Sequence, residues 1–229
     1  GLALVTQGEI LGEDEAVSLG RPVEASSFFE RGYRIVHDQA MADANDAVSR
    51  LAAATRGLRY AALLRHTDPR GALAVCDEIH RLTSQVRNNP RARRDEVRTL
   101  SLAARILIVL GRTGDARRRI DEAFSRLRDL KLYPSPSADF DSEPADALRA
   151  SADYYAATGD LPRAIAIHNE ILRLGAASKP GPESDIHTAF RLSALYSSLA
   201  SLHRRLGQPN GAAAFRARRI DLWRNWERK

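Results

Sequence analysis

The chain has 229 residues, with 35 Lys or Arg against 29 Asp or Glu and a formal net charge of +6. Its hydrophobic fraction of 44% is ordinary for a packed protein and excludes disorder over the whole chain. Its 37 Ala and 27 Leu favour helix over sheet. The single Cys excludes an internal disulfide framework and a cysteine-based zinc site, and no apolar run is long enough to span a membrane.

A repeat recurs along the chain. Three segments place a glycine between two helical patterns, at Gly111, Gly159 and Gly207, with intervals of 48 residues. Looser matches at Gly20 and Thr67 precede them at similar spacing. A glycine between two periodic runs is typical of a helix C-cap followed by a turn. The sequence therefore predicts helical hairpins, each made of two helices around a tight turn.

Small residues and prolines indicate how each hairpin is built. Alanine pairs twelve residues apart flank three of the turns, where two helices must approach closely: Ala104 and Ala116, Ala152 and Ala164, Ala200 and Ala212. Prolines suit the first turn of a second helix, where a missing N–H costs nothing: Pro22, Pro69, Pro162 and Pro209. We expect about ten helices in five hairpins within a single domain, residues 1–229. The units are roughly residues 1–40, 41–88, 89–133, 144–176 and 184–229.

These features resemble the tetratricopeptide repeat (TPR), and the fourth unit matches it best. Its Leu148, Ala152, Tyr155, Gly159 and Ala164 follow the family's order of large residue, small residue, aromatic, turn glycine and alanine. The resemblance implies an all-α fold, a right-handed superhelical solenoid of TPR-like helical hairpins. It also implies a non-enzymatic scaffold that binds a peptide or protein segment in a concave groove.

The C-terminal residues 212–229 resemble the tail of TPR regions that follow bacterial serine/threonine protein kinase domains. The resemblance implies the regulatory part of a larger bacterial signalling protein, although the chain contains no kinase motif of its own. It implies a cytoplasmic location by default, or an extracytoplasmic one if a membrane segment lies upstream. Trp223 and Trp226 are three residues apart on the last helix. We expect them to cover the open end of the array, or alternatively to form a domain or homodimer contact.

In the TPR frame, the first helix of each unit lines the groove. The groove positions of the last three units are mostly arginine and serine: Arg98, Ser101, Arg105, Arg149, Asp153, Ser197, Ser201, Arg204 and Arg205. Guanidinium groups bind carboxylates through paired hydrogen bonds, so the partner we expect is an acidic or carboxylate-ended peptide. The alternative is that these positions are ordinary solvated helix faces.

No residue pattern indicates catalysis, a cofactor or a metal ion, and we expect none of the three. No two histidines stand three or four residues apart, and His168 and His203 take positions where helices pack. Cys76 is expected to be a buried structural thiol. The acidic stretch from Asp139 to Asp146 lacks the glycine and final glutamate of a calcium loop, which favours a solvated loop leading into a helix.

Nucleic-acid binding through the arginine-rich helical surface is the alternative function. The densest clusters are Arg91, Arg93 and Arg94, and residues 117–119. Neither has the interleaved aromatic side chains that stack on bases, so nucleic acid is the less favoured partner. We also expect the positive charge to be spread along the repeats. A gel shift that weakens steeply with salt would support the alternative.

Overall fold

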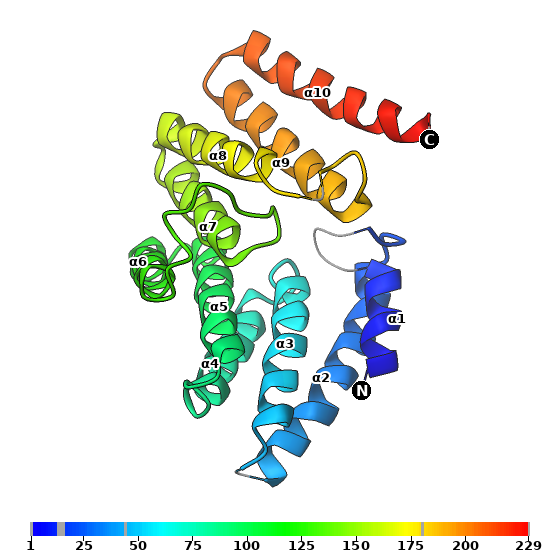
Figure 1. Cartoon of the computed structure of the whole chain (residues 1–229), viewed down its shortest axis with the longest axis vertical. Helices are drawn as coiled ribbons and strands as arrows, with labels where there is room; N and C mark the ends of the chain where they lie inside the picture. The colour runs from blue at the N-terminus through cyan, green and yellow to red at the C-terminus, as the bar shows by residue number, and fades with distance from the viewer. Residues whose placement is uncertain (1, 13–16, 44, 180, 229) are drawn as a thin grey trace. The chain divides into compact units, whose positions relative to one another are not determined.

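The structure is a computed structural model that describes residues 2–12, 17–43, 45–179 and 181–228. Within those ranges it contains ten α-helices and no β-strand (Figure 1). The helices are α1 (Leu2–Gly12), α2 (Pro22–Ala42), α3 (Ala47–Leu64), α4 (Pro69–Ser84), α5 (Pro90–Val109), α6 (Thr113–Asp129), α7 (Glu143–Thr158), α8 (Leu161–Ala176), α9 (Ile186–Arg205) and α10 (Pro209–Glu227). The all-α prediction is confirmed, and each predicted hairpin corresponds to two consecutive helices.

The chain forms two compact units. The first comprises residues 1–131 with α1 to α6, and the second comprises residues 132–229 with α7 to α10. Within each unit consecutive helices pack against one another, as in a helical solenoid. In the first unit α3 also packs against α5, so the first helices of two neighbouring hairpins touch. The single continuous domain and the handedness of a superhelix stay predictions.

The hairpin turns have the backbone conformation that their glycines predict. Gly20, Gly111, Gly159 and Gly207 have φ values between 69° and 93°. A Cβ is strained in that left-handed region, which explains why glycine occupies these turns. The second turn contains no such glycine, and there Asp68 caps α4 by accepting a 2.9 Å hydrogen bond from a backbone N–H of its first turn.

Prolines and alanines occupy the places that the repeat assigns to them. Four second helices carry proline in their first turn: Pro22, Pro69, Pro162 and Pro209. All six alanines of the predicted pairs are buried. Cys76 is also buried, in a cluster with Ala72 and Ile106, and burial raises the pKa of its thiol to about 12. The predicted structural role of Cys76 is confirmed.

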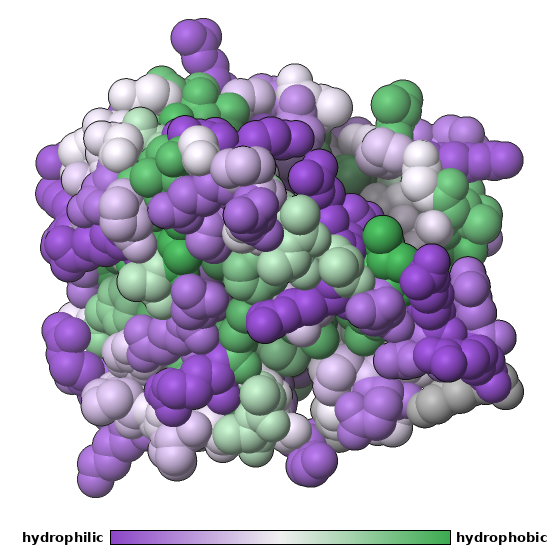
Figure 2. All heavy atoms as spheres, turned by 90° about the horizontal axis from the view of Figure 1, so that it is seen from above, coloured by the Kyte–Doolittle hydropathy of each residue, from purple (hydrophilic) through white to green (hydrophobic). Residues whose placement is uncertain are grey.

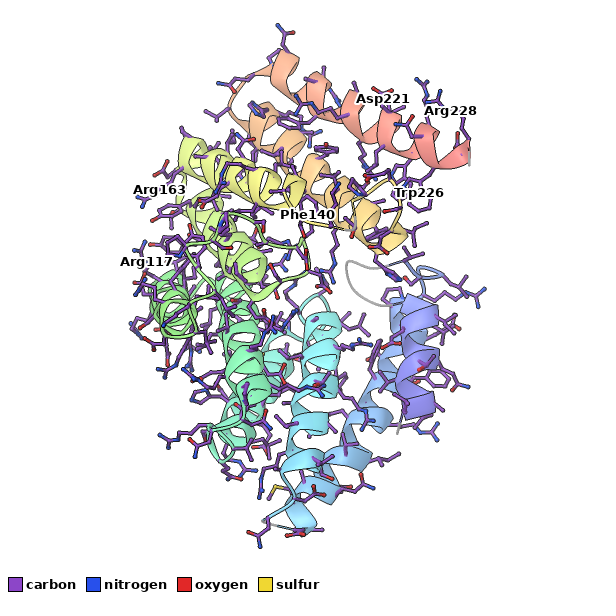
Figure 3. All side chains as sticks on the ribbon, viewed as in Figure 1. Arg117, Phe140, Arg163, Asp221, Trp226 and Arg228 are labelled. Atoms are coloured by element: carbon purple, nitrogen blue, oxygen red, sulfur yellow. The ribbon has the colours of Figure 1, made fainter. Side chains whose placement is uncertain are left out.

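A segment without helix or strand, residues 132–142, precedes α7 in the second unit; we call it the strap. The Tyr133 hydroxyl donates a 2.7 Å hydrogen bond to Glu170 of α8. Phe140 is 4% exposed and lies over Gly175 of α8, where a Cβ would overlap the aromatic ring (Figure 3). The strap is therefore part of the core of this unit.

The acidic stretch spans the end of the strap and the first turn of α7. Asp139 and Asp141 are exposed, but Glu143, the first residue of α7, is 3% exposed. The predicted solvated loop leading into a helical turn is confirmed, since the exposed acids lie in the loop and Glu143 and Asp146 lie in the first turn of α7. The helix still begins as the sequence suggests, since Ser142 accepts a backbone hydrogen bond as its N-cap.

The last helix, α10, has a single buried residue, Ala212. It contacts α9 through an aromatic face on which Phe215 stacks against His203, with ring centroids 5.4 Å apart, and lies 6.0 Å from the ring of Tyr196. The remaining faces of α10 carry arginines that are exposed. Apart from its contact with α9, α10 is therefore a solvated helix.

Both tryptophans of α10 are half-buried and hydrogen-bonded within the second unit. Trp223 Nε1 donates to Ser193 Oγ of α9 at 2.9 Å, and Trp226 Nε1 donates to the Pro182 carbonyl at 2.8 Å (Figure 3). The two side chains thus cover α9 and the loop that precedes it. Their contact with another domain or a second copy stays a prediction.

Candidate peptide-binding surface

Three of the predicted groove residues lie on α5 in the first unit. Ser101 is 1% exposed, and its Oγ donates a 2.8 Å hydrogen bond to the Val97 carbonyl of the same helix. Arg98 and Arg105, on the neighbouring turns, are half-buried. Ser101 therefore belongs to the core, whereas the two arginines reach the surface.

Arg149 and Asp153 lie on α7 in the second unit. Arg149 Nη1 donates to Asp146 at 2.8 Å, and its Nη2 donates to the Phe140 carbonyl of the strap. Only 12% of the Arg149 side chain is exposed. Arg149 thus fastens the strap to α7, a structural role that the TPR frame does not anticipate. Asp153, one turn further along, is half-buried.

The other four predicted groove residues lie on α9, and most of them face solvent. Ser197, Arg204 and Arg205 are exposed, and Ser201 is half-buried. Arg205 Nη2 donates a 2.7 Å hydrogen bond to the Ala156 carbonyl near the end of α7, which joins α9 to α7. Within the part of the chain that the structure describes, the side chain of Arg204 has no hydrogen bond or ion pair. The C-terminal half of α9 is therefore the most accessible part of the predicted groove.

In the first unit, the dense arginine cluster of α6 is paired with carboxylates. The pairs are Arg117–Asp121, Arg118–Asp115, Arg119–Asp77 and Arg126–Glu96. Two of them join neighbouring helices: Arg119 reaches α4 at 3.5 Å, and Arg126 reaches α5 at 3.1 Å. Figure 3 shows Arg117 on the outer side of α6. These acids cancel most of the local charge that the sequence shows in this cluster.

In the second unit, three arginines pair with carboxylates: Arg149 with Asp146, Arg191 with Asp141 and Arg224 with Asp221. Five arginines, Arg149 among them, bind neutral groups. Their partners are the Phe140 carbonyl for Arg149, the Ala156 carbonyl for Arg205, Ser193 Oγ for Arg219, and the rings of Tyr155 and Phe215 for Arg163 and Arg218. The ring contacts have guanidinium–centroid distances of 4.2 and 5.2 Å. A neutral partner orients a guanidinium without cancelling its charge. The positive potential of these arginines therefore persists at the surface.

Most of the excess charge belongs to one hairpin. Residues 186–229, which include α9 and α10, contain nine Lys or Arg against two Asp or Glu; we call them the basic hairpin. Residues 1–185 contain 26 basic against 27 acidic residues. The basic hairpin thus carries +7 and the rest of the chain −1. The expectation that the charge is spread along the repeats is wrong, and a count of acids in each hairpin would have shown it.

The molecular surface is mainly hydrophilic on the face that Figure 2 shows. Figure 2 shows a face on which hydrophilic side chains cover most of the area and hydrophobic ones form smaller patches between them. Such a face suits recognition by charge more than by a large apolar contact. The basic hairpin has two exposed large apolar side chains among its described residues, Ile186 of α9 at 40% and Ile220 of α10 at 51%.

A polar cluster ties α2 to α4 in the first unit. His37 Nε2 lies 2.7 Å from Glu78 Oε1, and Arg81 donates to both Glu78 oxygens at 2.6 and 2.8 Å. The Arg81 hydrogen bonds hold the pKa of Glu78 below its usual value. Burial, aided by the charge of Glu78, raises the pKa of the nearby Tyr33 to about 12. This cluster links two second helices across neighbouring hairpins.

Two further findings concern the described part of the chain. There, no three His, Cys, Asp or Glu side chains gather in a way that could hold a metal ion. In the same ranges, none of the helices combines the length and apolar character needed to cross a membrane. His168 and His203 take the packing positions that the sequence predicts, since His168 is buried and His203 stacks on Phe215.

These features define an all-α protein built from helical hairpins. No protein-family model matches the chain, and no curated protein matches it. Among solved structures, the chain is similar to the crystal structure of BtubC (BKLC) from P. vanneervenii, with a TM-score of 0.50 and 15% sequence identity. The match covers 88% of this chain and 91% of that one. At this identity the likeness shows the fold alone, so the TPR and kinase resemblances stay predictions.

Proposed function

We propose that this chain is a non-enzymatic protein-interaction module whose basic hairpin binds an acidic peptide or protein segment. The observation that carries the proposal is the net charge of +7 on residues 186–229, held by arginines that few carboxylates neutralise. Arg204, Arg205 and Arg218 of this hairpin are exposed. Guanidinium groups on a helical support bind carboxylates with defined geometry, because the support limits the entropy that binding costs.

The aromatic side chains of the basic hairpin favour protein over nucleic acid as the partner. Phe215 lies between His203 and the Arg218 guanidinium, and the indole N–H groups of Trp223 and Trp226 donate within the unit. Binding of single-stranded nucleic acid uses exposed aromatic faces on which bases stack. The ring of Phe215 is engaged by His203 and Arg218 and both indole N–H groups are used within the unit, which leaves less aromatic surface for bases to stack on.

The test is fluorescence anisotropy with a labelled peptide of alternating glutamate and glycine, at about 0.15 M salt. The matched probes are the glutamine version of that peptide and a single-stranded oligonucleotide. We expect the glutamate peptide to bind and the glutamine peptide not to bind. We expect Arg204→Glu combined with Arg218→Glu to weaken glutamate-peptide binding about tenfold or more.

Arg93→Glu combined with Arg128→Glu is the matched control, because both arginines are exposed in the first unit. It makes the same change in net charge, and we expect it to alter affinity less than about twofold at this salt concentration. Equal losses in the two double variants would contradict a site on the basic hairpin. Tighter binding of the oligonucleotide than of the glutamate peptide would favour the nucleic-acid alternative.

The origin of the chain and the identity of its partner are further expectations within this proposal. The regulatory part of a bacterial signalling protein, such as a serine/threonine kinase, would use a module of this kind to dock a partner. The resemblance of residues 212–229 to kinase-linked TPR tails supports that expectation at the level of sequence. Expression of the full open reading frame, followed by assay for kinase activity, tests it directly.

A further inference from the structure

A cavity of about 380 Å³ opens in the first unit between α4 and the turn that joins α5 to α6. None of its lining residues belongs to the predicted groove. The lining consists of two arginines, one aspartate and three apolar residues: Arg70, Leu73, Ala74 and Asp77 from α4, and Leu110 and Arg112 from the turn. This volume is within the range of pockets that hold small ligands or single side chains with their neighbours.

The apolar wall of the cavity is fixed by the core beneath it. Leu73 and Leu110 are half-buried and pack against the buried cluster that contains Cys76 and Ile106. Leu110 lies at the C-cap of α5, and the positive φ of Gly111 then turns the chain toward α6. The inner sides of both leucines are held by the core while their outer sides line the cavity. An aliphatic ligand group would cover those outer sides at little entropic cost.

The charges around the cavity leave a local positive excess. Asp77 is paired with Arg119 at 3.5 Å. Arg112 holds Asp115 through Nε at 2.7 Å, and Arg118 contacts the same carboxylate. These three contacts between arginine and aspartate neutralise Asp77 on the lining and Asp115 beside it.

Among the arginines that line the cavity, Arg70 is the one whose charge these ion pairs do not neutralise. The residue is exposed, and its guanidinium group makes no hydrogen bond or ion pair to any residue that the structure describes. Its position in the first turn of α4 places it on the lining of the cavity together with Leu73. The charge that complements this site is a single carboxylate.

We propose that this cavity binds a short peptide segment in which an aliphatic side chain stands next to a carboxylate. The aliphatic group contacts Leu73 and Leu110, and the carboxylate accepts hydrogen bonds from Arg70 at the rim. This site lies in the first unit and is separate from the basic hairpin. It adds an apolar requirement that a purely electrostatic surface does not have, so it selects among acidic segments.

The test uses N-acetyl-leucyl-aspartate as the probe and amide chemical shifts of the full chain as the readout. N-acetyl-leucyl-asparagine lacks the side-chain charge, and N-acetyl-alanyl-aspartate lacks the aliphatic group. We expect saturable shifts at Leu110, Gly111 and Arg112 with a Kd of about 1 mM, a value usual for so small a ligand. We expect each matched probe to bind about fivefold more weakly or worse.

Two variants test the residues. Arg70→Gln should weaken the leucyl-aspartate probe about fivefold. Ala74→Glu should abolish its binding, since it places a carboxylate in the cavity from an exposed position of α4. Arg128→Gln, at an exposed position of α6 outside the lining, is the control and should leave the affinity unchanged.

Unchanged amide shifts elsewhere in the spectrum will show that each variant is folded. The proposal is overturned if the probe gives no saturable shift, if the asparagine probe binds equally well, or if Arg70→Gln binds as the unaltered chain does. None of these results bears on the basic hairpin, whose variants and probe differ.

Discussion

The helix α6 of the first unit and the basic hairpin of the second unit differ in how their arginines are paired. In the first unit, arginines of α6 pair with carboxylates on their own helix and on α4 and α5, as in Arg117–Asp121 and Arg119–Asp77. In the second unit, arginines donate to backbone carbonyls and a hydroxyl, as Arg205 does to Ala156 and Arg219 does to Ser193. Carboxylates also pair with arginines in the second unit, as Asp146 does with Arg149, but they pair with fewer of the arginines of the basic hairpin than of α6.

The difference shows that arginine content alone does not locate a binding surface. A cluster of arginines with interleaved acids gives little net field, whereas scattered arginines with neutral partners give a strong one. The densest run in the sequence, residues 117–119, lies on α6, where each of these arginines is paired with a carboxylate. The accessible charge lies on the basic hairpin, whose arginines are more widely spaced.

Replacement of Arg149 should have the largest effect on stability. Arg149→Ala removes the donor to the Phe140 carbonyl and leaves Asp146 without its 2.8 Å partner in a half-buried site. We expect the second unit to lose about 3 kcal/mol of unfolding free energy. Both tryptophans belong to that unit, so urea unfolding followed by tryptophan fluorescence reports on it.

Arg128→Ala is the comparison in the first unit. Arg128 is exposed on α6, so circular dichroism should show a change within about 0.5 kcal/mol. An equally small effect of Arg149→Ala would contradict the structural role of the strap. It would also return Arg149 to the set of residues that could serve a partner.

Replacement of Gly175 should have the next largest effect. In Gly175→Ala, the added methyl group would overlap the ring of Phe140, and we expect a loss of about 2 kcal/mol. Gly114→Ala in the first unit is the matched control, since a Cβ there meets no atom within 4 Å. It should be neutral or slightly stabilising. Thermal unfolding of both variants checks this, and equal effects would mean that the strap does not pack on α8.

The fold could be predicted because its signals are local. The turn glycines have a positive φ at Gly111, Gly159 and Gly207, and the alanines at fixed spacing are buried. Each of these two patterns has one physical explanation. The strap could not be predicted, because the packing of Phe140 on Gly175 joins residues far apart in sequence. The Pro- and Ser-rich composition of this segment indicated only that a helix is interrupted there.

The candidate site was only partly predictable. The repeat frame placed Arg204 and Arg205 on an accessible helix face, where the structure has them. It also named Ser101 and Arg149, which burial and the strap withdraw from the surface. A frame assigns a residue to a face of a helix, but what covers that face depends on contacts between helices. The cavity at Arg70 had no sequence signal, since its lining combines α4 with a distant turn.

The cluster between α2 and α4 should make the first unit sensitive to acid. Because the folded state lowers the pKa of Glu78, the contribution of Glu78 to stability is present above the ordinary glutamate pKa of about 4.3. It is lost as the pH falls through the lower pKa of the folded state. At neutral pH, Glu78→Gln should cost about 1 kcal/mol, since it weakens bonds to Arg81 and His37.

The difference in Tm between Glu78→Gln and the unaltered chain should therefore shrink below about pH 4. Circular dichroism at a series of pH values measures it. Glu24→Gln is the control, because the Arg21–Glu24 pair is 3.6 Å long and more than half exposed. It should change Tm little at any pH. A pH-independent difference for Glu78→Gln would show that the carboxylate charge contributes nothing to the link between the helices.

The smallest effect we predict is the coupling between Arg117 and Asp121. The two side chains are 44% and 58% exposed, so a double-mutant cycle with alanine should give about 0.3–0.5 kcal/mol. A value above about 1.5 kcal/mol would mean that the carboxylates of α6 hold the fold together. A small value means that these carboxylates mainly lower the positive electrostatic potential at the surface.

In that case Asp121→Asn should leave stability unchanged and add one uncompensated positive charge to the first unit. Because the first unit then begins to behave as the basic hairpin does, binding of the glutamate peptide should become slightly tighter, and more so at low salt.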